Sequence, residues 1–321
     1  MSSPPSPRET SRYQRLNMVL GLAHATATLA VLLILPVAFR LHLLDVDWGW
    51  FCVALPVALI SNGFWALQHE AIHNLFAADQ AVNRRAGRIM GVLFGSSFRA
   101  LRFSHLMHHR FNRNPLDCPD VFDPRTTSAV KAHIRFFAGL FGGIYLIEAF
   151  SPLLYWLPAP AIRRLLARIH RGDDPRLKQL HQLAGQALGS PRAIAEIRQD
   201  SAMVLVLYGC ALALWGAHWP GLLIFILLRG TLISFLDNVY HFRTPLDRPH
   251  FAYNLRLARP FRALILNMNF HRIHHNQMHL PWWRLPRQFE RSQEIFDAEY
   301  FNAALAQLRG PAPTHMLGTH K

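Results

Sequence analysis

The sequence predicts an all-α integral membrane protein with about four transmembrane helices, further helices at the membrane interface and a helical cap on the cytoplasmic side. Two observations lead to this fold class. Apolar residues make up 51% of the 321-residue chain, and they lie in long blocks rather than spread out as in a soluble protein. The charged residues, 34 Lys and Arg against 19 Asp and Glu, collect between those blocks.

Four apolar blocks approach the roughly 20 residues that an α-helix needs to cross a bilayer. They cover residues 17–39, 48–67, 201–219 and 221–236. A turn at Ala217-His-Trp-Pro-Gly221 separates the last two blocks, so we expect them to make a there-and-back crossing.

The basic residues indicate the orientation of these spans. Arg8, Arg12 and Arg15 precede the first block, and many arginines follow the second, whereas the connections after Phe39 and Trp219 are nearly free of them. The positive-inside rule places the termini and the long connections in the cytoplasm. We expect an integral protein of a bacterial inner membrane, with its active site on the cytoplasmic side. Nucleic acid is not an expected partner, because no basic recognition module is visible.

Histidines form the most informative pattern in the chain. Nine of the 19 fall into three clusters and one isolated position: His69-Glu-Ala-Ile-His73, His105-Leu-Met-His108-His109, His271-Arg-Ile-His274-His275, and His241 alone. Spacings of three or four place side chains on one face of a helix, and neutral imidazole binds iron, zinc, copper and nickel. One zinc ion takes about four ligands, so two metal ions sharing nine histidines explain the pattern better.

A fifth apolar stretch, at residues 136–158, needs a separate interpretation. If the three clusters build one site, all of them must lie on one side of the membrane. One crossing at 136–158 would put the third cluster on the opposite side, and two crossings do not fit in about 23 residues. We therefore expect an interfacial or re-entrant helix pair, broken at Ser151-Pro152.

The remaining segments are expected in the cytoplasm. Residues 1–16 are predicted to form a disordered N-terminus. The membrane domain is assigned to 17–290, with a basic, polar insert at about 159–200. Residues 291–321 are assigned to a C-terminal helix and tail. The helix itself is expected over 287–308, so it begins just before this boundary, and a loose tail is expected over 309–321.

The first cluster also satisfies the HExxH pattern, with Glu70 after His69. In zinc proteases this pattern supplies two zinc ligands and a general base, so a membrane zinc protease is an alternative. That hypothesis needs only one more ligand and leaves two HxxHH clusters without a role. The two-metal site is the favoured hypothesis.

With one HxxxH and two HxxHH clusters over four spans, the chain resembles the membrane fatty acid desaturase superfamily, which includes acyl-lipid and acyl-thioester desaturases, acetylenases, hydroxylases and carotenoid ketolases. The likeness covers about residues 45–290 and includes Asp237-Asn-Val-Tyr-His241 and His279-Leu-Pro-Trp-Trp-Arg-Leu-Pro286. It implies that the cap holds a di-iron site that activates O2. The iron ligands it implies are His69, His73, His105, His108, His109, His241, His271, His274 and His275.

The resemblance implies an O2-dependent oxidoreductase that introduces a double bond into a lipid-, CoA- or carrier-protein-linked acyl chain. A hydroxylase, an acetylenase or a carotenoid ketolase is the alternative. The cofactors are two iron ions, with O2 as co-substrate, and no catalytic residue is assigned beyond the metal centre. The sequence has no haem, iron–sulfur or dinucleotide motif. Electrons must therefore come from a separate protein, and we expect a ferredoxin or a cytochrome b5-type donor that docks on the basic face. The same face would equally suit an acidic acyl carrier protein.

Four carboxylates are candidates to accept the second ring N–H of the ligand histidines. These are Glu70, Asp237, Asp120 and Asp123. For Asp120 and Asp123, helix capping or contact with solvent is the alternative. Animal acyl-CoA desaturases have Asn at the position of Asp237, so its role as a water-mediated ligand is left open.

Three further residues are candidates for contact with the substrate or with membrane lipids. Asn62 and Trp65 lie near the end of the second span and would line an acyl tunnel, with packing between helices as the alternative. Arg229 lies inside the last apolar block, where a charge is costly and usually functional. It would meet a substrate head group or an internal carboxylate, or extend toward the outer face.

Overall fold

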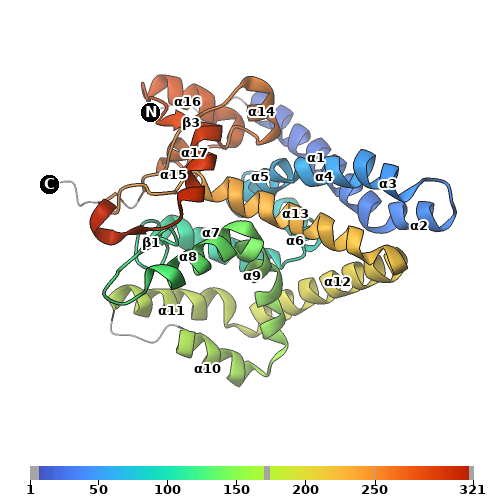
Figure 1. The fold of residues 1–321 in the computed structure, drawn as a ribbon, viewed down its shortest axis with the longest axis horizontal. Helices are drawn as coiled ribbons and strands as arrows, with labels where there is room; N and C mark the ends of the chain where they lie inside the picture. Colours follow the sequence, from blue (N-terminus) through green and yellow to red (C-terminus); the bar gives the residue numbers. More distant parts are fainter. Residues whose placement is uncertain (1–6, 170–173, 249, 318–321) are drawn as a thin grey trace.

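Helices α1–α5, α12 and α13 form an elongated arm, and most of the other helices form a cap at one end of it (Figure 1). The structure is a computed structural model that describes residues 7–169, 174–248 and 250–317. Within them, four helical segments are long and apolar enough to cross a membrane: Arg8–Arg40, Val46–Ile72, Ala129–Trp156 and Pro191–Asn238. The chain therefore has the all-α membrane fold that its sequence predicts.

The first two of these segments are interrupted helices. The first consists of α1 (Pro7–Leu29), a π-helical turn (Ala30–Ile34) and α2 (Leu35–Arg40). The second consists of α3 (Val46–Gly49), a π-helical turn (Trp50–Ala54), α4 (Leu55–Leu59) and α5 (Ser61–Ile72). Pro36 and Pro56 stand at the starts of α2 and α4. A proline ring clashes with the carbonyl four residues earlier, and a π-helical turn relieves that clash.

The fourth segment is a helical hairpin, as the turn in the sequence predicts. It contains α12 (Pro191–Trp215), a short 3-10 turn (Gly216–His218) and α13 (Trp219–Asn238). Gly216 has a φ of 52°, which a residue with a side chain rarely adopts. The Trp215 ring packs edge-on against Phe39 at 5.7 Å, so the hairpin is fixed against the first segment.

The third segment, which contains the fifth apolar stretch, is kinked. It contains α8 (Ala129–Ala138), a distorted turn (Gly139–Gly143), α9 (Ile144–Phe150) and a 3-10 turn (Ser151–Trp156). The sharpest break lies at Phe141 and Gly142, where φ of Gly142 is 103°, and the α-helix ends again at the predicted Ser151-Pro152, where a 3-10 turn begins. Pro152 stands at the start of a 3-10 turn, where its missing N–H costs little. The interfacial or re-entrant placement of this segment stays a prediction.

The other helices are shorter, and several of them surround the histidines. Their bounds are α6 (Gln80–Phe94), α7 (Phe98–Phe111), α10 (Ala159–Ile169), α11 (Pro175–Leu188), α14 (Arg259–Leu264), α15 (His271–Asn276), α16 (Leu285–Arg291) and α17 (Tyr300–Ala306). Three 3-10 turns lie at Trp282–Arg284, Gln307–Arg309 and Thr314–Leu317. Two parallel strand pairs join distant segments: β1 (Val121–Phe122) with β4 (Ala312–Pro313), and β2 (Leu255–Arg256) with β3 (Ala298–Glu299).

The structure corrects the expectation for the C-terminal segment. The helix predicted over 287–308 is two helices, because α16 ends at Arg291 and α17 begins at Tyr300. Gln293, with a φ of 52°, lies in the connection, whose residue Phe296 stacks on Phe289 at 4.5 Å. The expected loose tail is also wrong for residues 309–317, since β4 pairs with β1 there. Residues 318–321 lie outside the described part.

The N-terminal segment also differs from its prediction. Residues 7–16, expected to be disordered, form the first turns of α1, while residues 1–6 lie outside the described part. The Tyr13 ring stacks on Trp283 at 4.2 Å, and the indole N–H of Trp282 donates to Asn17 at 2.9 Å. These contacts fix the start of α1 against the segment that follows the third histidine cluster.

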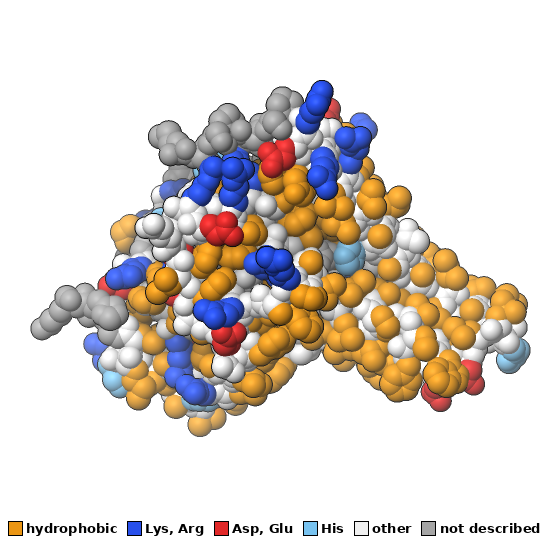
Figure 2. Space-filling model, turned by 90° about the horizontal axis from the view of Figure 1, so that it is seen from above, with side chains coloured by type: hydrophobic (Ala, Val, Ile, Leu, Met, Phe, Trp, Pro, Cys, Tyr) orange, Lys and Arg blue, Asp and Glu red, His pale blue; other side chains and the backbone are white. Residues whose placement is uncertain are grey.

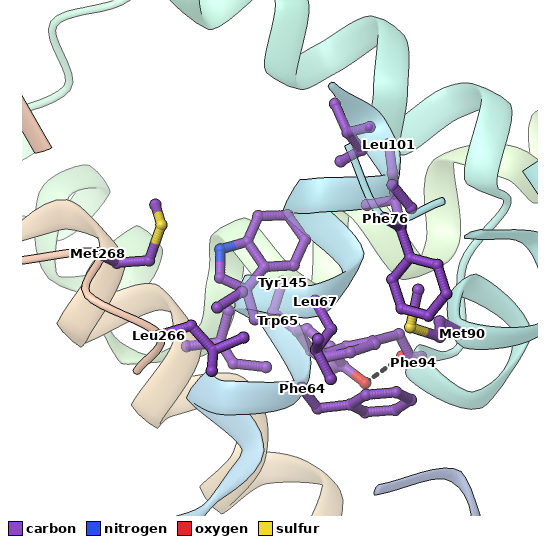
Figure 3. Close-up of a cluster of buried hydrophobic side chains, with 14 of the residues drawn as sticks. Phe64, Trp65, Leu67, Phe76, Met90, Phe94, Leu101, Tyr145, Leu266 and Met268 are labelled. Carbon is purple, nitrogen blue, oxygen red and sulfur yellow. Dashed lines mark hydrogen bonds between the residues drawn. The ribbon is translucent and has the colours of Figure 1, made fainter. Parts of the chain in front are cut away.

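The surface and the core both agree with a membrane protein. Figure 2 shows hydrophobic side chains over the arm on the right, whereas Lys and Arg gather over the rest of the molecule. Exposed apolar residues on α1 and α12 include Leu22 and Val206, which suits contact with lipid. The largest buried cluster joins α5, α6, α7 and α9, with Trp65, Phe94 and Tyr145 close together (Figure 3).

Candidate metal centre

The first two histidine clusters lie on rigid, largely buried helices. His69 is in the last turn of α5, and His73 is the residue that ends this helix, one turn later. The second cluster occupies the last two turns of α7, where His105 and His109 are buried. Helix geometry therefore points these imidazoles in fixed directions, as the spacing predicts.

The other four histidines come from the C-terminal half of the chain. His241 lies just after α13, in a turn where its N–H donates to the carbonyl of Asn238 at 3.1 Å. The third cluster forms most of α15, with His271, His274 and His275 all buried.

All nine predicted histidines meet at one place in two adjacent groups. Within each group the candidate ligand nitrogens lie within 4.8 Å of one another. The five-histidine group contains His69, His73, His105, His109 and His274. The four-histidine group contains His108, His241, His271 and His275.

Short distances between Nε2 atoms show how the rings converge. Nε2 of His105 lies 3.0 Å from that of His73 and 2.9 Å from that of His109. In the four-histidine group, Nε2 of His241 lies 3.1 Å from those of both His108 and His271. The two groups touch through the His109 and His275 rings, whose centroids are 4.3 Å apart. Two metal ions would therefore be near neighbours.

The hydrogen bonding of the ring nitrogens shows whether metal ions fit this site. Both ring nitrogens of His69 and of His275 are buried without a hydrogen-bond partner among the described residues, as are Nδ1 of His241 and of His271. Buried polar atoms are normally paired, and unpaired ones need an explanation such as an ion. A donor set made only of imidazole suits iron, zinc, copper or nickel.

Burial keeps most of these imidazoles neutral, which is the form that binds a metal ion. Burial lowers the pKa of His73 to about 4, and the nearby Arg102 adds to this effect. Burial also holds the pKa of His241, His271 and His275 well below the usual value for histidine. The site therefore offers neutral ligands at neutral pH.

His108 is the exception, because a carboxylate holds its ring. Burial disfavours its charged form, but attraction and a hydrogen bond from Asp117 outweigh burial and raise the pKa of His108. Nδ1 of His108 lies 2.6 Å from Oδ2 of Asp117, which leaves Nε2 facing the four-histidine group. The sequence analysis did not identify Asp117 as a partner of His108. Its position soon after the second cluster was a signal that could have identified it.

The two acids predicted in its place have other partners. Asp120 is buried and pairs with Arg113 at 2.7 Å, and the same guanidinium donates to the carbonyl of His241 at 3.2 Å. Asp120 therefore holds the backbone that carries His241 rather than an imidazole ring. Asp123 pairs with Arg125 near the surface. The expectation that these two carboxylates bind histidine rings is thus corrected.

Glu70 and Asp237 are close to the histidines but also have other partners. Oε1 of Glu70 accepts the backbone N–H of Trp282 at 3.1 Å, while Oε2 is buried without a partner among the described residues. Oδ1 of Asp237 accepts the indole N–H of Trp65 at 3.1 Å. Both acids therefore position neighbouring segments, and no hydrogen bond of the described residues joins either to an imidazole.

Of the three predicted substrate residues, only Trp65 faces a cavity at the site. The amide of Asn62 donates to the carbonyl of Leu232 at 3.4 Å, which joins α5 to α13. Arg229 is fully buried, and it donates to the hydroxyls of Tyr145 and Tyr208 at 2.7 and 2.6 Å. Among the described residues it forms no ion pair with a carboxylate, and because it is buried it does not reach the outer face. Its hydrogen bonds fix α13 to its neighbours.

The cavity beside Trp65 has a volume of about 160 Å³ and borders both histidine groups. Three histidines line it: His105, His108 and His241. Glu148, which the sequence analysis missed, lies on α9 and also lines the cavity. The sequence contains a signal that could have identified Glu148 as a candidate site residue, because it is the single charged residue between 136 and 158.

Comparison with known proteins assigns the sequence of this chain to a family. The model of the fatty acid desaturase family matches residues 47–304, which include all nine histidines. The chain belongs to the fatty acid desaturase family. This is a family of oxidoreductases, and the two histidine groups are compatible with a metal site.

Two curated plant proteins are also similar to this desaturase family member. A Delta(12) fatty acid desaturase, DES8.11, of Calendula officinalis is 24% identical over 204 residues, 63% of this chain and 51% of the relative. A Delta(12) fatty acid dehydrogenase of Crepis alpina is 25% identical over 204 residues, 63% of this chain and 52% of the relative. The matched stretch thus spans about half the length of each relative.

Proposed function

We propose that this protein is an O2-dependent di-iron acyl desaturase, which introduces a double bond into an acyl chain carried by a lipid, by CoA or by a carrier protein. One observation carries the proposal: nine histidines from four separate segments converge in two adjacent groups within a fatty acid desaturase chain. The curated relatives named as fatty acid desaturase and dehydrogenase support the same class of reaction.

In this proposal each histidine group holds one iron. His69, His73, His105, His109 and His274 hold the first, and His108, His241, His271 and His275 hold the second. When bound and reduced, the irons supply the O2 chemistry that removes hydrogen from an unactivated C–H bond. The electrons come from a ferredoxin or cytochrome b5-type protein that docks on the basic cytoplasmic cap. An acidic acyl carrier protein would suit the same surface.

The protein's own residues position the acyl chain and exclude water. Trp65, Ile144 and Ile233 form an apolar wall of the cavity, against which a methylene chain would pack. His105 and His108 line the same cavity, so the packed methylenes would lie beside the metal centre. Holding the chain in one orientation supplies much of the rate in such a reaction.

The same cavity would serve a hydroxylase, an acetylenase or a carotenoid ketolase, so the product distinguishes these alternatives. The zinc protease hypothesis has less support. His69 and His73 share a group with three histidines from the other clusters, and one oxygen of Glu70 already accepts the N–H of Trp282. A protease site would leave most of these histidines without a role.

The test combines metal analysis with product analysis. The full chain is expressed in a bacterial host, cell lipids are analysed by mass spectrometry with and without O2, and active protein is purified gently for metal content. We expect alkenes that depend on O2 and close to two irons per chain. Hydroxyl or keto products would select an alternative within the family. Active protein with one zinc and no iron would contradict the di-iron proposal.

A further inference from the structure

Another cavity lies between α6 and the start of α12. It has a volume of about 240 Å³. Near it, Arg88 of α6 donates to Asp200 of α12 at 2.7 Å. Farther along both helices, the hydroxyl of Tyr208 donates to the carbonyl of Leu93 at 2.8 Å. The two helices therefore run side by side in the same direction, with this cavity near the end where both begin.

Three of the six residues that line this cavity are arginines, so we call it the arginine cavity. Its lining consists of Arg84, Arg88, Arg192, Ala195, Glu196 and Gln199. None of these residues lines the cavity beside Trp65. The arginine cavity is therefore a separate feature, which the proposed function does not use.

Two ion pairs compensate the acidic groups at the arginine cavity. Glu196, whose side chain is 12% exposed, pairs with Arg99 at 2.7 Å. Arg88 pairs with the fully buried Asp200 at 2.6 Å. Each of these carboxylates thus has a guanidinium of its own, so neither compensates a further arginine.

The other two arginines of the cavity keep uncompensated charges. Neither Arg84 nor Arg192 belongs to an ion pair among the described residues. The amide of Gln199 adds N–H donors, because its oxygen accepts from Arg88 at 3.3 Å. Guanidinium groups form paired hydrogen bonds with phosphate oxygens. The arginine cavity therefore suits a phosphate group better than a neutral ligand.

The arginine cavity lies at the edge of a surface that can face lipid. On α12 the exposed side chains change from Arg192 and Gln199 to Met203, which is 52% exposed and lies one helical turn, about 6 Å, beyond Gln199. On α6, Ile89 follows Arg88 and is 56% exposed. The positive-inside rule assigns the basic ends of both helices to the cytoplasmic side. A phosphate in the arginine cavity would thus lie at the level of lipid headgroups, with apolar surface directly beside it.

We propose that the arginine cavity binds the phosphate of an anionic phospholipid from the cytoplasmic leaflet. Arg84 donates to the phosphate from α6 and Arg192 donates from α12, while the acyl chains of the lipid lie along Ile89 and Met203. Basic residues at this surface of a membrane attract anionic lipids. The inference does not rest on the proposed function, because the lipid is held outside the cavity beside the histidines.

The bound lipid also stabilises the helices that position the second histidine cluster. Asp200, beside the arginine cavity, accepts from the hydroxyl of Ser97 at 3.0 Å. Ser97 is the residue that precedes α7, the helix that carries His105 and His109. A lipid that joins α6 to α12 therefore supports the same framework as α7.

Binding is measured by native mass spectrometry of the purified full chain in detergent, which counts bound lipids during a titration. We expect one phosphatidylglycerol to bind roughly tenfold tighter, or more, than diacylglycerol with the same acyl chains, because a basic residue near an anionic lipid contributes about fivefold. Equal affinity for the two lipids would overturn the proposal. Glycerol 3-phosphate should displace the lipid only at far higher concentration. Displacement at the concentration of the lipid itself would indicate a site for free phosphate esters and would overturn the assignment to a lipid.

Variants test the two assigned arginines. Arg84→Gln and Arg192→Gln should each weaken phosphatidylglycerol binding roughly fivefold, and neither should change the affinity for diacylglycerol. The double variant R84Q/R192Q is compared with R287Q/R291Q, which removes the same charge from two exposed arginines of α16. An equal loss of affinity in the two double variants would show a general effect of net charge and would contradict the proposal.

Thermal unfolding provides a second measurement that does not depend on turnover. A ligand that binds the folded chain raises its unfolding temperature, so phosphatidylglycerol should stabilise the wild type and R287Q/R291Q alike. It should stabilise R84Q/R192Q much less, while all three proteins unfold at similar temperatures without added lipid. The same stabilisation of all three proteins by phosphatidylglycerol would refute a role for Arg84 and Arg192 in binding.

Discussion

Replacing Asp117 by Asn should weaken metal binding in the four-histidine group. Oδ2 of Asp117 lies 2.6 Å from Nδ1 of His108, and Nε2 of His108 lies 3.1 Å from Nε2 of His241. The carboxylate orients the ring and makes Nε2 a stronger ligand, whereas an amide keeps the shape but loses the charge. Loss of such a partner typically costs about 10- to 100-fold in metal affinity, or roughly 1.4–2.7 kcal/mol.

The assay is competition between the purified protein and a chelator for iron(II) under anaerobic conditions, which resolves two binding steps per chain. Asp117→Asn should weaken one step and leave the other close to wild type, because the five-histidine group does not contain His108. The matched control is Asp123→Asn, since Asp123 pairs with Arg125 near the surface. If D117N and D123N behave alike, or if both steps weaken equally in D117N, the argument from His108 is refuted.

Three further predictions follow from other parts of the molecule. His241→Ala should leave three histidines in its group and abolish O2-dependent product formation, measured by lipid mass spectrometry; retained activity would remove His241 from the ligand set. Gly142→Ala should lower thermal stability by about 1–2 kcal/mol, because φ there is 103°. Gly185→Ala, in open space on α11, should raise it by roughly 0.5–1 kcal/mol, and equal melting temperatures would contradict the strain at Gly142. A single cysteine at Gln179, in a background without the native cysteines, should react only with reagents on the cytoplasmic side; labelling from outside would refute the topology.

The helices and the histidine set could be predicted because both depend on short-range patterns. Apolar blocks of span length mark the helices, and spacings of three and four place histidines on one helix face. The positions of α5, α7 and α15 relative to one another follow from the need to bring three clusters to one site. These inferences required no knowledge of loop conformation.

The carboxylates could not be predicted in the same way. Asp117 and Asp120 lie in the loop after α7, where Arg113 has a φ of 63° and the chain turns back on itself. A spacing argument cannot decide which of several acids in such a loop reaches a histidine. The strand pair β1 and β4 joins Val121 to Ala312, and a two-residue contact over that sequence distance leaves no periodic pattern. No sequence pattern therefore predicts that the residues after 308 pair with β1.

The histidines of each HxxHH cluster are divided between the five-histidine and four-histidine groups, and this division explains why the isolated His241 is needed. On a helix the first and last histidines of this motif lie about 40° apart, while the middle one lies about 60° away on the other side of the first. Accordingly, His105 and His109 share one group, and His108 joins the other. The third cluster divides in the same way, but its parts join the opposite groups: the middle residue, His274, joins His105 and His109, while His271 and His275 join His108. Helices α7 and α15 thus each contribute histidines to both groups. The first cluster adds His69 and His73 to the five-histidine group, which contains His274.

This division gives the four-histidine group only three histidines from α7 and α15. His241, in the turn just after α13, supplies the fourth. The same helix carries Asp237, which lines the cavity. The membrane hairpin that ends at His241 therefore does more than anchor the protein. It completes the four-histidine group and contributes Asp237 to the lining of the cavity, so that the candidate substrate and metal sites depend on one helix.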